Sequence, residues 1–121
     1  MINNTSYIKK YNSLQSINEE LSIDDSFMII SLDGSELKTK NSFIRIFYDQ
    51  IFAPLTFWLN WAAFEDTIRD QEFWITKKLV LIIKNKNALF VTSEESQDRL
   101  YLDSILIDLI QLEGYYIYLA S

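Results

Sequence analysis

Cysteine and histidine are both absent from the 121 residues of this chain. Without cysteine, neither a disulfide nor a thiolate nucleophile can form, and an intracellular location is expected. Without either residue, the usual zinc sites, Cys–His nucleophile pairs and Ser–His–Asp triads cannot be built. The sequence therefore argues against the commonest hydrolytic and zinc-dependent chemistries, and it gives no reason to expect a cofactor or a metal.

Positive charge is scarce, since 11 Lys and Arg residues stand against 17 Asp and Glu residues, for a formal net charge of −6. A surplus of basic side chains is needed to neutralise phosphates, so we expect no nucleic acid as a direct ligand. The acidic balance fits plain solubility. It also fits a basic protein partner, because opposite net charges speed encounter.

Long apolar runs and a secretory leader are missing as well. The N-terminal residues contain no apolar core followed by a small-residue cleavage site. The longest mostly apolar window, residues 51–64, is interrupted by Pro54, Thr56 and Asn60 and is too short to cross a bilayer. We therefore expect a cytoplasmic protein without membrane contact.

Hydrophobic residues make up 49% of the chain, which is enough to build the core of a folded domain of this length. Apolar runs at residues 27–32, 79–84 and 115–119 predict strands, and the middle run is typical of a strand buried on both faces. Residues 89–92 are compatible with a further short strand.

Helical spacing of apolar side chains predicts four helices. They are an N-terminal helix with Tyr7, Tyr11, Leu14, Ile17 and Leu21 on one face; a helix after Ser42 with Phe43, Ile46, Phe47, Ile51 and Phe52; a helix over residues 60–70; and a helix after a capping box at 92–95, with Leu102, Ile105, Leu106, Leu109 and Leu112, closed by Gly114. The predicted fold is α/β, with a small, mainly parallel three-stranded sheet flanked by helices and an N-terminal helical extension.

The stretch from residue 54 to residue 74 holds the only proline and all three tryptophans, beside several acidic side chains. On a helix, Trp61, Phe64 and Ile68 share the buried face. The opposite face carries Ala62, Asp66, Arg69 and Asp70. This face could be an ordinary solvated surface or a protein-recognition site, at which tryptophan is enriched. Catalysis is the least favoured reading, because neighbouring helical carboxylates point about 100° apart and do not converge on one bond.

Several segments together resemble the barstar family of intracellular inhibitors of secreted bacterial ribonucleases. They are SLDGSEL, FIRIFYDQIFAP, PLTFWLNWAAFEDTI, KKLVLIIKN and EGYYIYLAS, within residues 26–121. The family's central motif is Tyr-Tyr-Gly-x-Asn, a hydrophobic residue, then Asp-Ala-Leu-x-Asp. Here it reads Thr56-Phe57-Trp58-Leu59-Asn60, then Trp61-Ala62-Ala63-Phe64-Glu65-Asp66. The resemblance divides the chain into an extension, residues 1–25, and a barstar-like domain, residues 26–121.

The resemblance implies a small parallel sheet flanked by helices and an inhibitory surface formed by the second family helix and the loop before it. Asp66 matches the acidic residue that enters the cationic active site of the nuclease, where it stands in for a substrate phosphate. Asn60 matches a position that helps to hold the binding loop. The expected partner-binding residues are Thr56, Trp58, Asn60, Ala62, Glu65, Asp66, Arg69, Asp70 and Gln71.

Four positions depart from the family motif. The first recognition acid is Ala62, the loop glycine is Trp58, the tyrosine that lies against the enzyme is Thr56, and the interface glutamate of the last helix falls at Leu109. These changes suit an inhibitor adapted to a different toxin, with specificity moved onto Trp58 and the Asp66/Asp70 pair.

The sequence thus predicts a non-enzymatic immunity protein that blocks a basic ribonuclease toxin domain as the monomeric half of a 1:1 heterodimer. Two alternatives stay open. The toxin could be a different nuclease inhibited away from its active site, or the chain could be an assembly module that shares only the fold.

Overall fold

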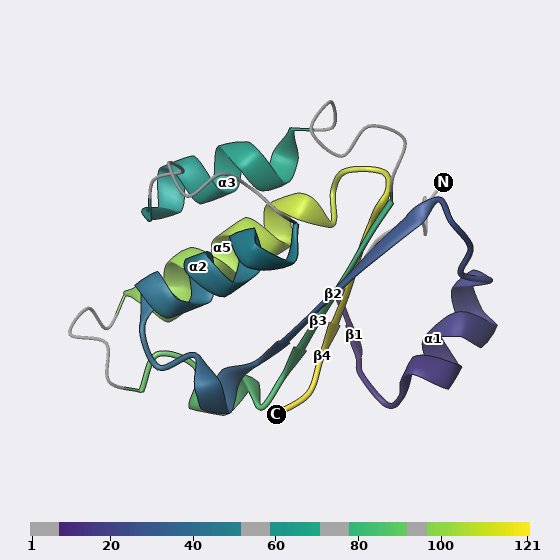
Figure 1. The fold of residues 1–121 in the computed structure, drawn as a ribbon, viewed down its shortest axis with the longest axis horizontal. Helices are drawn as coiled ribbons and strands as arrows, with labels where there is room; N and C mark the ends of the chain where they lie inside the picture. The colour runs from purple at the N-terminus through teal and green to yellow at the C-terminus, as the bar shows by residue number, and fades with distance from the viewer. Residues whose placement is uncertain (1–7, 52–58, 71–77, 92–96) are drawn as a thin grey trace.

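The computed structural model describes residues 8–51, 59–70, 78–91 and 97–121, and it has three layers (Figure 1). A parallel sheet in the order β1-β4-β3-β2 forms the middle layer. Its strands are β1 (Ile8–Lys10), β2 (Phe27–Asp33), β3 (Lys78–Lys84) and β4 (Tyr115–Leu119). One face carries α2 (Lys40–Gln50), α3 (Trp61–Arg69) and α5 (Asp98–Leu109), and the other carries α1 (Leu14–Leu21). The α/β class and the parallel sheet are confirmed.

The strand β3 lies at the centre of the hydrophobic core. Its residues Leu79 to Ile83 are all buried, as the unbroken apolar run predicts. It pairs with β2 on one side and with β4 on the other. The predicted strands at 27–32 and 115–119 are thereby confirmed, with β2 extending one residue further, to Asp33.

The prediction of three strands is wrong, because β1 adds a fourth. This strand pairs in parallel with β4, with Ile8 opposite Ile117. Two of its three residues are lysines, so it has no apolar run that would predict a strand. The open edge of β4 supplies its hydrogen-bond partners instead, and such tertiary pairing is invisible to local patterns.

The predicted N-terminal helix is correspondingly shorter than its apolar spacing suggests. Helix α1 starts after Ser13, whose side chain accepts a hydrogen bond from the Ser16 amide. Tyr11 precedes the helix, and Leu14 is 56% exposed. Ile17 is buried against Val80, Ile82 and Tyr118, which form a small second core.

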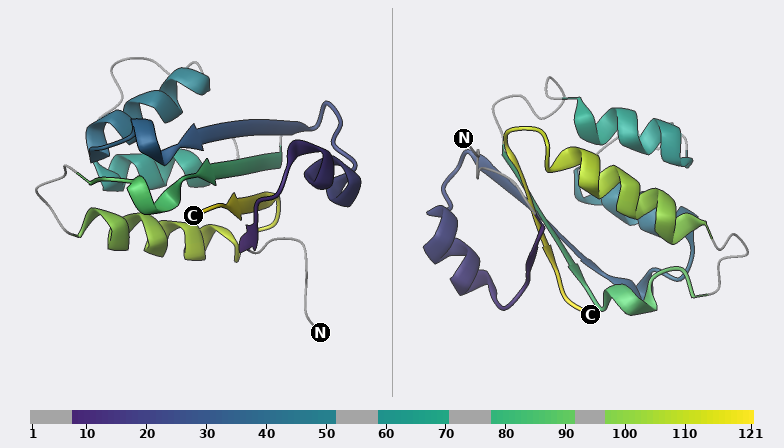
Figure 2. Two further views of the ribbon diagram at one scale, coloured as in Figure 1. Left: turned by 90° about the horizontal axis from the view of Figure 1, so that it is seen from below. Right: turned by 180° about the vertical axis from the view of Figure 1, so that it is seen from behind.

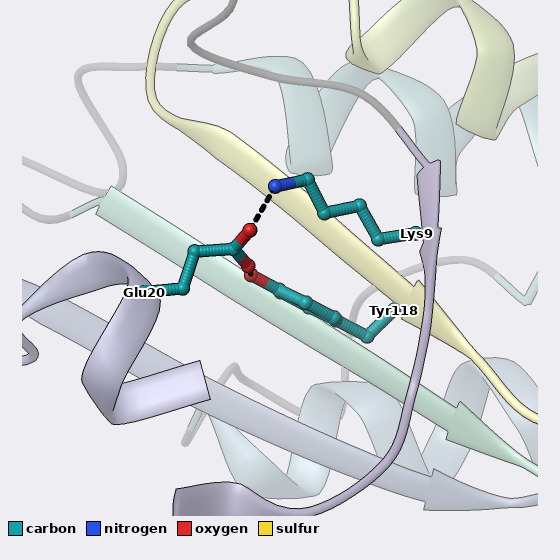
Figure 3. Close-up of polar contacts among 3 residues, drawn as sticks. All are labelled: Lys9, Glu20 and Tyr118. Atoms are coloured by element: carbon teal, nitrogen blue, oxygen red, sulfur yellow. Dashed lines mark hydrogen bonds and ion pairs between the residues drawn. The ribbon is translucent and has the colours of Figure 1, made fainter. Parts of the chain in front are cut away.

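A polar cluster fastens α1 to the sheet (Figure 3). Glu20 from α1 forms an ion pair with Lys9 of β1. Its other carboxylate oxygen accepts a hydrogen bond of 2.5 Å from the Tyr118 hydroxyl of β4. The contacts with Lys9 and then Tyr118 hold the pKa of Glu20 below its ordinary value of 4.5.

Helix α2 differs from its prediction at its start and on its buried face. Thr39 and Ser42 form a reciprocal capping box, so the helix begins at Lys40 and not after Ser42. Ile46 is 38% exposed. The buried side chains are Phe43, Ile44, Phe47, Tyr48 and Ile51. The buried stripe is rotated from the predicted one because α2 packs over the edge strand β2, where one side of the helix stays in solvent. Phe52 lies outside the described residues.

The connections near the end of β3 also correct the sequence reading. Residues 89–91 form a turn and not a strand, and Phe90 has a positive φ of 61°. Earlier in the same connection, Asn85 lies so close to Gly34 that a Cβ on Gly34 would be 2.2 Å from the Asn85 carbonyl oxygen.

The apolar face of α5 is confirmed, with Leu102, Ile105, Leu106 and Leu109 buried and Leu112 packed against the core. The predicted helix end at Gly114 is wrong. The helix ends at Leu109 with Ile110 as its C-cap, and Gly114 has a φ of 94° in the turn into β4. The capping box predicted at 92–95 lies outside the described residues.

Candidate functional site

Helix α3 runs alongside α2 and α5 in the helix layer (Figure 2). Asn60 caps its N-terminus, because the side-chain oxygen accepts a hydrogen bond of 2.8 Å from the Ala63 amide. Trp61, Phe64 and Ile68 are buried, as the sequence predicts. The helix therefore has a fixed start and a fixed rotation, which determine the side chains that face solvent.

A buried polar contact fixes the first turn of α3. The Trp61 indole Nε1 donates a hydrogen bond of 3.0 Å to Asp98 Oδ1 at the start of α5. Asp98 is only 2% exposed. Since a buried donor or acceptor without a partner costs roughly 1–3 kcal/mol, this bond joins α3 to α5 in one relative position.

The middle and the end of α3 are fixed as well. Phe64 is fully buried and packs edge-to-face on Phe47 of α2, with ring centroids 4.9 Å apart. The Tyr115 hydroxyl donates a hydrogen bond of 2.7 Å to the carbonyl oxygen of Ile68. Contacts with two neighbouring helices and one strand thus hold the helix along its length, so that its outer face is preorganised.

That outer face is acidic. Ala62, Asp66 and Arg69 are exposed, and so is the C-cap residue Asp70. Glu65 is half-buried, and its carboxylate pairs with the Arg69 guanidinium at 3.0 Å. In this i, i+4 pair, the negative charge of Glu65 and the positive charge of Arg69 offset each other. Asp66 and Asp70 are the other two charged residues of the face.

The structure thus brings five of the predicted partner-binding residues onto one exposed side of α3 and a sixth, Asn60, to its N-cap. Thr56, Trp58 and Gln71 lie outside the described residues. The inward face predicted for Trp61, Phe64 and Ile68 is confirmed. The part that the exposed residues play in binding stays a prediction.

Across residues 8–51, 59–70, 78–91 and 97–121, no three His, Cys, Asp or Glu side chains are grouped so that they could hold a metal ion. In those same ranges, no helix is long and apolar enough to span a membrane.

A comparison with protein-family models decides the relationship. Residues 27–113 match the model described as barstar (barnase inhibitor), which accounts for 87 of the 121 residues. The chain belongs to the barstar family. A search of curated proteins returned no match.

Members of the barstar family are non-enzymatic inhibitors, and membership implies binding of a barnase-type ribonuclease. The match includes β2, α2, α3, β3 and α5, which are the elements that build and hold the outer face of α3. It begins after β1 and α1, so these two elements lie before the matched region. Leu109, which the resemblance aligns with the family's interface glutamate, is fully buried and contributes to the core.

Sequence reasoning missed Asp98, the buried partner of Trp61. A signal was present, because Asp98 lies four residues before Leu102 and seven before Ile105, on the apolar face of α5. A carboxylate on such a face must find a hydrogen-bond donor in the core. The indole of Trp61 is one such donor.

Proposed function

We propose that this chain is an immunity protein that blocks the active site of a basic barnase-type ribonuclease with the outer face of α3. Family membership supports the inhibitory role. The observation that carries the proposal is an exposed acidic face on a helix held at its start by Asp98 and near its end by Tyr115. A preorganised face avoids much of the entropy cost of ordering on binding.

The chemistry follows from the substrate of such an enzyme. A ribonuclease cleft is lined with Arg and Lys side chains that bind phosphates, and a carboxylate placed there makes strong charge-assisted hydrogen bonds. Asp66 is exposed near the middle of the outer face, and we assign it the place of a substrate phosphate. Inhibition is then competitive, since the helix and the substrate occupy the same cleft.

The neighbouring residues take supporting roles. Glu65 and Arg69 hold each other and present a mixed-charge border, while Asp70 and Gln71 extend the rim. Ala62 leaves room next to Asp66 where the family has a second acid. Thr56 and Trp58 add contacts from the segment before the helix, and Asn60 fixes where that segment ends.

The proposed inhibitor acts in the bacterial cytoplasm as a monomer that forms a 1:1 complex with the nuclease. Residues 26–121 form the inhibitory domain, and residues 1–25 are an extension of it. In the structure, β1 of this extension forms one edge of the sheet, and α1 packs on the sheet face opposite α3 (Figure 1). Binding at α3 therefore requires no contribution from α1.

The first test uses a basic nuclease domain encoded beside the gene for this chain. That domain is produced with and without the chain, and total RNA is examined on a gel. We expect RNA to be degraded by the domain alone and to stay intact when the chain is present. Intact RNA in cells that still die without the chain would keep the immunity role and remove the ribonuclease.

The second test separates Asp66 from general charge. We expect Asp66→Asn to weaken binding by at least about 2 kcal/mol, because the position forms the buried centre of the interface. Glu19→Gln removes one exposed charge from α1, across the sheet, and is the matched control. Equal affinities for both variants, measured by calorimetry, would remove Asp66 from the site. A nucleotide analogue that still binds the complex would place inhibition outside the active site.

A further inference from the structure

The strand β2 forms one edge of the sheet, and this edge carries an unusual side-chain contact. In a parallel strand, successive residues direct their N–H and C=O groups to alternate sides. The Lys78 amide donates to the Ser26 carbonyl oxygen, so even-numbered residues at this point address β3. Ile29 and Ser31 therefore direct their backbone groups outward, away from the sheet.

Gln50, at the end of α2, satisfies both outward groups of Ser31. Its Nε2 donates a hydrogen bond of 2.8 Å to the Ser31 carbonyl oxygen. Its Oε1 accepts a hydrogen bond of 3.2 Å from the Ser31 amide. An amide that donates to and accepts from the same residue reproduces what a residue of a neighbouring strand would do.

The surroundings of this contact would otherwise favour strand addition. Ile29 is 42% exposed on the edge strand, and Ile46 is 38% exposed on α2. Ser31, Asp33, Ile46 and Gln50 line one open hollow beside β2. An exposed edge strand with apolar neighbours is a template for pairing with another chain unless something closes it.

We propose that Gln50 closes the β2 edge against β2 of a second copy of this chain. A second copy presents the same edge, and two β2 strands can pair antiparallel about a two-fold axis. In the register centred on Ile30, each Ser31 lies opposite Ile29 of the other copy. Both central hydrogen-bonded pairs of that register need Ser31, which Gln50 already occupies.

This assignment is independent of the ribonuclease-inhibitor proposal. The edge of β2 and the outer face of α3 are different surfaces, and nuclease binding is no part of the test.

The test is the mass in solution of Gln50→Ala as a function of concentration. By analytical ultracentrifugation, we expect the unaltered chain to stay monomeric from low micromolar to the highest soluble concentration. The weight-average mass of Gln50→Ala should rise toward twice the monomer mass over the same range. Gln111→Ala, which removes an exposed glutamine from the turn after α5, should behave like the unaltered chain.

A second variant identifies the surface. Ile29→Lys places a charge on the edge strand, so the double variant Ile29→Lys/Gln50→Ala should return to the monomer mass. Hydrogen exchange at low concentration checks the contact directly, because the Ser31 amide should exchange faster in Gln50→Ala. If Gln50→Ala does not fold, Gln50→Asn, one methylene too short to span the same two bonds, replaces it.

Two results would overturn the proposal. One is a Gln50 variant that stays monomeric at every concentration although its Ser31 amide exchanges faster. The other is association that Ile29→Lys does not reverse, since this would place the contact away from the β2 edge.

Discussion

The two faces of the sheet are built very differently. On one face, α2, α3 and α5 bury a continuous core that includes Phe43, Phe47 and Phe64. On the other face, the single helix α1 buries Ile17 against Val80, Ile82 and Tyr118. The candidate site lies on the thickly packed side, and the polar cluster of Lys9, Glu20 and Tyr118 supports the thin side (Figure 3).

The difference shows how the fold divides its tasks. A binding face of fixed geometry needs a helix that cannot shift, and aromatic packing on several sides supplies that rigidity. A cover that only shields one sheet face can depend on fewer apolar contacts and on exposed ion pairs, which contribute little stability each. We therefore expect variants on the α3 face to lower both stability and nuclease binding. Variants on the α1 face should cause local opening and leave binding unchanged.

The largest effect is expected on the thickly packed face. Phe64→Ala should lower the free energy of unfolding by about 3–5 kcal/mol, because a fully buried aromatic ring leaves a cavity. Urea denaturation followed by tryptophan fluorescence measures the change. Nuclease binding should fall with it, and a variant that binds normally would show that α3 does not depend on this packing.

A smaller effect is expected on the thin face. Ile17→Ala should cost about 2–3 kcal/mol, at the low end for isoleucine because the neighbouring side chains can relax. Limited proteolysis should cut near α1 while nuclease affinity stays unchanged. If Ile17→Ala weakens binding as strongly as Phe64→Ala, the two faces act as one cooperative unit and the contrast fails.

The polar anchor of α3 comes next. Asp98→Ala should cost about 1–2 kcal/mol, because the buried Trp61 indole loses its acceptor. Asp98→Asn keeps an oxygen in place and should cost less. Urea denaturation gives the loss in unfolding free energy for each variant. Comparing the two losses separates the contribution of the hydrogen bond from that of the side-chain volume. Equal costs would mean that packing, and not the bond, positions α3.

The smallest effect depends on pH. The contacts with Lys9 and Tyr118 lower the folded-state pKa of Glu20, so its contribution is complete above the ordinary value of 4.5 and is lost as the pH falls through the lowered pKa. Glu20→Gln should therefore reduce stability at neutral pH by less than about 1 kcal/mol. Thermal melts of both proteins should converge as the pH falls below the lowered pKa of Glu20. A constant difference across this range would rule out the carboxylate charge as the cause.

Local patterns predicted the elements whose burial follows from their own residues. The unbroken apolar run from Leu79 to Ile83 is typical of a strand buried on both faces, and it is one here. The spacing of Trp61, Phe64 and Ile68 determines which face of α3 is buried. The outer face of α3 followed from the same geometry.

What local patterns did not show depends on partners far away in the chain. The strand β1 exists because β4 offers an edge, and Asp98 is buried because Trp61 meets it. Gln50 lies in a polar position of an ordinary helix, and only the tertiary fold brings it to Ser31. The start of α2 was misplaced because both Thr39 and Ser42 can cap a helix, and the structure uses them together.

The pairing of β1 with β4 also sets an order of events during synthesis. Ile8 lies opposite Ile117, so one of the first described residues to be made must wait for one of the last. Pairings between such distant residues form slowly, because a long loop has to close first. During translation, β2 and α2 are synthesised long before β4, the strand with which β1 pairs. The N-terminal cover is thus expected to dock last, over a sheet that has already formed.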